Sequence, residues 1–204
     1  PIDQTGERIV FVMDQTPEGL PTVEAHVQVS YTGTAESFAW VVPMPARPTI
    51  GISSPQLFNW VDRATQPQFQ LTFDQGCGFR GFPPMFSDNL AAGGSPEMDG
   101  GGGVSVVAVQ DVGPYTAATL QATDSEALTT WLRGNGYDVT DAGAAALVPY
   151  LGEKYYFVAL KLQRGREVGD LKPIRLNFEH STPCIPIQLT AIAAQPDMPI
   201  IAYV

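Results

Sequence analysis

The sequence predicts an α+β fold, a mostly antiparallel β-sheet with two or three short helices packed on one side. The first observation is a strict alternation of apolar and polar residues over 23–31, which is typical of a strand with one wet face. The second is a strand–helix–strand arrangement around 115–162, which adds helices to the sheet. A β-rich domain often reaches this size undivided, and we expect residues 1–204 to form a single domain.

The N-terminal third predicts three strands before the first helix. Residues 8–13 are mostly β-branched or aromatic and are followed by a turn-rich stretch at 14–21, so we expect them to pair with or lie beside 23–31. A further strand at 37–42 is expected to end at Pro43, which has no amide hydrogen for the ladder.

A short helix is predicted to begin after Ser54, which can cap it, with Pro55 in the first turn. Its buried stripe is expected to consist of Leu57, Phe58 and Val61. Residues 69–73 then alternate as another half-buried strand.

Regularity disappears from residue 76, and a glycine-rich loop is expected at 83–103. Loops of this length are usually functional or disordered, so the segment is a candidate interaction loop. Its candidate residues are Asp88, Asn89, Glu97, Asp99 and Gly100. The acidic ones lack the regular spacing of known calcium loops, which favours a solvated excursion over a calcium site.

The C-terminal half alternates between strands and helices. Strands at 104–109 and 115–121 flank a Gly113-Pro114 turn, and Thr123 with Glu126 forms a capping box for a helix that buries Leu128, Trp131 and Leu132. Further elements are an alanine-rich helix at 141–151 and strands at 155–162, 174–178, 187–193 and 200–204.

The chain is acidic, with 11 Lys and Arg residues against 21 Asp and Glu residues and a formal net charge of −10. A negative surface repels phosphate backbones and anionic lipid head groups, so we expect no nucleic-acid partner. No apolar run approaches the roughly eighteen residues of a membrane span, and no transmembrane segment is expected in this chain. The chain begins at Pro1, which is typical of a mature product or an excised piece.

Five long tracts carry a resemblance to a known family. They are FAWVVPMP at 38–45, LFNWVDRAT at 57–65, VGPYTAATLQATDSEALTTWLRGNGY at 112–137, YFVALKL at 156–162 and LTAIAAQPDM at 189–198. In these tracts, which run nearly end to end apart from the glycine-rich loop, the chain resembles the bacterial domain of unknown function 2330. The resemblance implies export to the cell envelope or the extracellular space, with a signal peptide and a cysteine-containing segment ahead of this part and often a hydrophobic C-terminal anchor. It brings no established catalytic residues.

The two cysteines, Cys77 and Cys184, favour a disulfide in an exported protein. Such a bond would close a loop of about a hundred residues and stabilise the fold by roughly 3–5 kcal/mol. Two alternatives stay open: buried free thiols, and pairing with cysteines upstream of the chain.

Catalysis by a cysteine would need His26 or His180 as its base. His180 and Cys184 are separated by roughly 10 Å or more in extended chain, and His26 projects from the polar face of its strand, where we expect it to be solvated. These four residues also lack the short ligand spacings of zinc sites, so neither a metal nor a cofactor is expected.

Motifs for serine catalysis, phosphate binding and sugar binding are not convincing either. Residues 51–54 and 94–96 do not fit the G-x-S-x-G turn of serine hydrolases, and the glycine run at 100–103 lacks a following Lys-Ser/Thr. The tryptophans lie among apolar neighbours and are expected in the core rather than on a sugar-binding surface: Trp40, Trp60 and Trp131.

Two hypotheses about function follow. The first is a non-catalytic structural or binding module of the cell envelope or extracellular space that associates with itself, as a homo-oligomer or filament, or with another envelope protein. The alternative is a secreted, hydrolase-like enzyme without a recognisable motif. Convergent polar groups in a pocket would favour the enzyme, whereas exposed strand edges would favour assembly.

Overall fold

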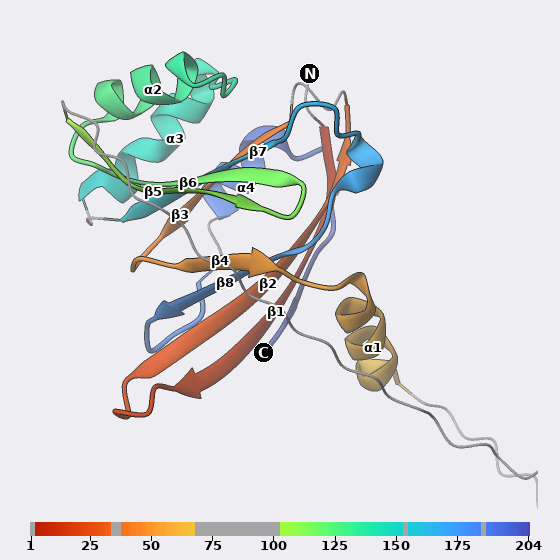
Figure 1. Ribbon diagram of the computed structural model, residues 1–204. Coiled ribbons are helices and arrows are strands. Elements are labelled where there is room, and N and C mark those ends of the chain that lie inside the picture. The colour runs from red at the N-terminus through yellow and green to blue at the C-terminus, as the bar shows by residue number, and fades with distance from the viewer. Residues whose placement is uncertain (1–2, 34–37, 68–102, 153–154, 185–186) are drawn as a thin grey trace, which may run out of the picture.

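The computed structural model describes residues 3–33, 38–67, 103–152, 155–184 and 187–204. Within these ranges the chain forms nine strands in two sheets, four α-helices and a short 3₁₀ helix, and the predicted α+β class is confirmed. The two sheets pack on each other, and helices cover both outer faces (Figure 1).

Sheet 1 has the strand order β4-β8-β2-β1-β9. Its strands are β1 (Asp3–Gln15), β2 (Pro21–Thr32), β4 (Thr49–Ile52), β8 (Ile174–Glu179) and β9 (Ile200–Tyr203). The predicted pairing of the first two strands is present as an antiparallel hairpin, with Ile9 opposite Val27. Only the pairing of β9 with β1 is parallel within this sheet.

Sheet 2 is antiparallel throughout, with the order β3-β7-β6-β5. Its strands are β3 (Ala39–Met44), β5 (Val104–Val112), β6 (Tyr115–Ala122) and β7 (Tyr156–Leu162). The predicted turn between β5 and β6 is present, and Gly113 adopts φ 57°, which a residue with a side chain rarely takes. The 3₁₀ helix η2 (Val168–Asp170) lies between β7 and β8.

The central strand β7 explains the layered core, because both of its faces are buried. Val158 and Leu160 face sheet 1 and join its inner residues in one core. Phe157 and Ala159 point the other way, towards α2 (Ser125–Gly134) and α3 (Asp141–Gly152).

The remaining helices cover other surfaces. On the outer face of sheet 1, α1 (Pro55–Thr65) packs Phe58 and Val61 against Val10 (Figure 1). The short helix α4 (Ile187–Ala193) contacts α3 and β1. The helices are therefore divided between the sheets, which corrects the expectation of two or three helices on one side.

Three local predictions are wrong in detail. β3 continues through Pro43, which is tolerated because β3 is an edge strand of sheet 2. Residues 187–193 form a helix instead of a strand, since a short apolar run does not distinguish the two. The cap of α2 is Asp124, whose carboxylate accepts a hydrogen bond from the Ala127 amide at 2.8 Å, and not Thr123. The expected strand at 69–73 and the loop at 83–103 lie outside the described residues.

Candidate functional site

A pocket of about 530 Å³ lies where strands of both sheets meet α3 and α4. Most of its lining is apolar, and the principal apolar side chains are Val29, Phe38, Trp40, Leu147, Leu189 and Ile192. The volume falls within the range of about 300–1,000 Å³ that is usual for small-molecule sites.

The segment that leads into α3 forms one wall of this pocket. Thr140 lines it, and the Thr140 hydroxyl accepts a hydrogen bond from the Gly143 amide at 3.1 Å, which caps the start of α3. Arg133 at the end of α2 donates to the carbonyl of Val139 at 3.0 Å and to the carboxylate of Asp141 at 3.1 Å. These hydrogen bonds from Arg133 therefore hold this wall of the pocket against α2.

A buried carboxyl group, that of Glu7, lies beside the pocket and is only 4% exposed. Two residues that line the pocket donate to the same oxygen of this group: Gln4 through its amide and Thr190 through its hydroxyl, each at 3.2 Å. Burial raises the pKa of Glu7, although both hydrogen bonds act in the opposite direction. The Thr190 bond also fastens α4 to β1.

A bulge in β1 explains why Gln4 and Glu7 can meet. Side chains three residues apart in a regular strand point to opposite faces. The register of β1 against β2 shifts between Gln4 and Gly6, and one extra residue restores the two side chains to a common face. A sequence pattern of strict alternation therefore cannot reveal this pair.

Cys184 shares the lining of a second cavity with Glu7. It is half-buried, and this much smaller cavity, of about 20 Å³, is also lined by Thr190. Burial raises the pKa of the Cys184 thiol, which favours the neutral form over a reactive thiolate. Its predicted disulfide partner Cys77 lies outside the described residues, so the bond stays a prediction.

The predicted interaction loop also lies outside the described residues. It comprises Asp88, Asn89, Glu97, Asp99 and Gly100. The described residues that line the pocket are not among the site residues that the sequence predicts. The apolar residues at 187–193, which the sequence predicts as a strand, form α4 and contribute Leu189 and Ile192 to the lining.

Two aromatic residues differ from their predicted surroundings. His26 was expected in solvent, but its side chain is only 12% exposed and lies between Ser53 and Glu24. Burial lowers the pKa of His26, with a smaller contribution from Arg175, although the neighbouring Glu24 acts in the opposite direction. Trp60 was expected in the core but is 64% exposed on α1, whereas Trp40 and Trp131 pack against the cores as expected.

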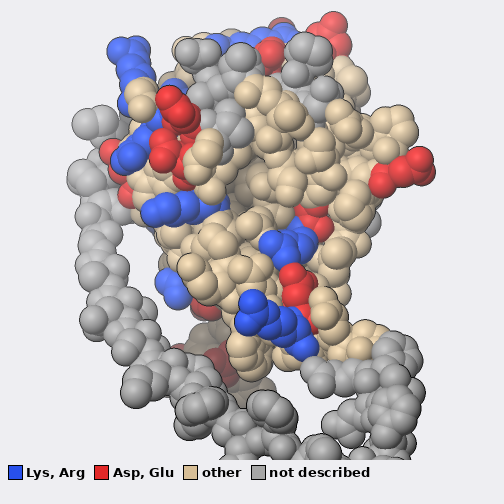
Figure 2. Space-filling view, turned by 90° about the vertical axis from the view of Figure 1, so that its right-hand side faces the viewer, with Lys and Arg blue, Asp and Glu red and all other residues tan. Residues whose placement is uncertain are grey.

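Charged side chains of both signs are interleaved on the face shown in Figure 2, among a larger area of uncharged residues. In the described ranges, no group of three or more His, Cys, Asp or Glu side chains is arranged to hold a metal ion. Nor does any helix in those ranges have the length and apolar character to cross a membrane.

Comparison with known proteins identifies a family but no individual related protein. No curated protein and no solved structure matches the chain. The model of a family described as uncharacterised protein conserved in bacteria, DUF2330, matches residues 21–204. The match includes β2 and every later element, and the chain therefore belongs to the DUF2330 family of bacterial proteins.

Proposed function

We propose that this protein is an exported binding module of the cell envelope or extracellular space, which holds a small, mainly apolar ligand between α3, α4 and the two sheets. The observation that carries the proposal is the pocket of about 530 Å³ with its apolar lining. Pockets of this kind, with a small number of polar groups, are the usual form of small-molecule sites.

The polar residues in the lining of the pocket indicate which kind of ligand would fit it. Gln4 and Thr190 lie together at one part of the lining, and both already donate to the carboxyl group of Glu7. A ligand with one polar end and a larger apolar body would place the polar end near this group and the body against Trp40 and Leu189. Export is supported by the composition and by the resemblance of the five tracts.

Titration of the protein with 1-N-phenylnaphthylamine, whose fluorescence rises in apolar surroundings, tests the proposal. Ala142→Trp adds bulk at an exposed position that lines the pocket, and should weaken binding about tenfold or more. Ala64→Trp places the same side chain at an exposed position on α1 and serves as the matched control. Equal affinity for all three proteins, or no saturable binding by the unmodified protein, would contradict the proposal.

Self-association is a second candidate, favoured by the edge strand β9. Among the described residues, β9 pairs only with β1, and it exposes Ile201, which is 44% accessible, at a sheet edge. Such edges can pair with another chain. Native mass spectrometry tests this directly: an oligomer that Ile201→Lys dissociates would support it, and a monomer at all accessible concentrations would refute it.

A further inference from the structure

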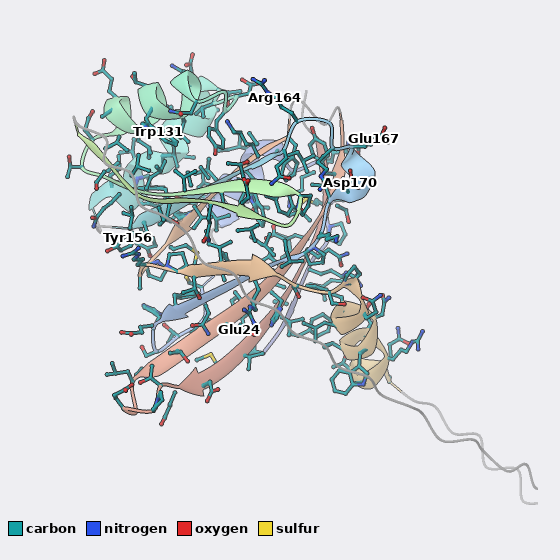
Figure 3. The ribbon with its side chains drawn as sticks, in the orientation of Figure 1. Glu24, Trp131, Tyr156, Arg164, Glu167 and Asp170 are labelled. Atoms are coloured by element: carbon teal, nitrogen blue, oxygen red, sulfur yellow. The ribbon has the colours of Figure 1, made fainter. Side chains whose placement is uncertain are left out.

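Four polar residues gather on the outer face of sheet 1, near the point where β4 leads into α1. Glu24 and His26 are two residues apart on β2 and share a face of the strand. Figure 3 shows Glu24 within this sheet, far from the helix that carries Trp131. Ser53 is the first residue after β4, and Arg175 on β8 lies opposite both His26 and Gly51.

The three central side chains form a chain of hydrogen bonds. Ser53 Oγ lies 2.7 Å from His26 Nδ1, and His26 Nε2 lies 3.0 Å from Glu24 Oε1. The tautomer with the proton on Nε2 satisfies both contacts: Nε2–H donates to the carboxylate, and Nδ1 accepts from the serine hydroxyl. A hydroxyl, a base and a carboxylate that orients the base are the parts of an activated serine nucleophile.

The Arg175 guanidinium group lies beside these side chains, and Ser53 is partly exposed. Arg175 Nη1 lies 3.8 Å from Glu24 Oε2, and the Arg175 side chain is 45% exposed. A Cβ at position 51 would lie 3.2 Å from Arg175 Nε, so Gly51 leaves room for the guanidinium group. Ser53 itself is only half-buried, so part of this residue is open to solvent.

We propose that Ser53 is a nucleophile for small esters, with His26 as its general base. Ser53 Oγ forms a bond to the ester carbonyl carbon while its proton passes to His26 Nδ1. The leaving alkoxide takes that proton and departs as an alcohol, and water then hydrolyses the acyl-serine to a carboxylic acid and the free hydroxyl. Glu24 acts as a positioning residue that holds the imidazole, and Arg175 is the positive charge beside it.

This activity is independent of the apolar pocket and does not require the G-x-S-x-G turn. Residues 51–54 depart from that motif, and among the described residues only Asp197 combines a side chain with positive φ. The contacts of Ser53, His26 and Glu24 place the hydroxyl, the base and the carboxylate in line. The same contacts also fasten the start of α1 to β2, so the test must separate reactivity from stability.

The experiment treats the full chain with an alkyl fluorophosphonate, which forms a stable phosphonyl-serine and releases fluoride, and follows the adduct by intact mass and peptide mapping. We expect one adduct on Ser53, none in Ser53→Ala, and a labelling rate about a hundredfold lower in His26→Gln. Glutamine keeps an amide that can hydrogen-bond to Ser53 but cannot accept its proton.

Ser30→Ala removes an exposed hydroxyl from the same strand as His26 and should label at the unchanged rate. Denaturant titration of each variant checks that it is folded. No adduct on the folded protein, an adduct on another residue, or labelling of Ser53 that is equally fast in folded His26→Gln would each overturn the proposal.

Discussion

The attachment of α1 to sheet 1 gives a sharp test of the packing, because two large aromatic residues of this helix have opposite surroundings. Phe58 is 0% exposed and contacts Val10 and Val61, and the Arg8 guanidinium carbon lies 5.3 Å from the centre of its ring. Emptying such a site costs about 3–5 kcal/mol. Phe58→Ala should therefore lower the free energy of unfolding by about that amount in urea titrations followed by circular dichroism.

Trp60 provides the matched control within the same helix. Because 64% of its surface is exposed, Trp60→Ala should change the free energy of unfolding by no more than about 0.5 kcal/mol. Equal losses for Trp60→Ala and Phe58→Ala would refute the placement of α1. An early, separate transition in Phe58→Ala alone would instead show that α1 detaches before the sheets unfold.

Three further predictions concern other parts of the molecule. Because burial raises the pKa of Glu7 above 4.5, its stabilising contribution is present at low pH and is lost as pH rises through the folded pKa. In urea titrations, Glu7→Gln should therefore gain stability relative to the unmodified protein as pH rises above 4.5, and a difference that does not change with pH would contradict this. Cys77 and Cys184 should be joined, so thiol titration of denatured, unreduced protein that finds two free thiols would disprove the bond. Replacing residues 88–101 with a short Gly-Ser linker should cost little stability, because loop closure depends weakly on length; if the loop serves assembly, native mass spectrometry should find the variant folded but monomeric.

Local chemistry made most of the strands and the cap of α1 predictable. Residues 23–31 alternate because one side of β2 faces the core between the sheets, and this pattern needs no knowledge of the partner strand. Ser54 was predicted to cap α1 and does so, since its hydroxyl accepts from the Gln56 amide. These features depend on neighbours in sequence, and they were confirmed.

Long-range packing decided what could not be predicted. Phe58 lies in the buried stripe of α1 as predicted, but the outward position of Trp60 depends on how the helix meets sheet 1. His26 lies on the polar face of its strand as expected, but Ser53 approaches it from β4, 27 residues along the chain. The pocket is lined by residues of β1, β2 and β3 together with residues of α3 and α4. No local sequence pattern indicates that these elements lie side by side.

The ligand site that we propose is the space between α3, α4 and the sheets. Amide chemical shifts in a ¹⁵N–¹H spectrum, recorded during titration with 1-N-phenylnaphthylamine, test it most directly. We predict that the shifts that change and saturate belong to residues around the pocket, such as Val139, Leu147 and Leu189, while those of α1 stay constant. Saturating shifts centred on Trp60, with none around the pocket, would contradict the claim.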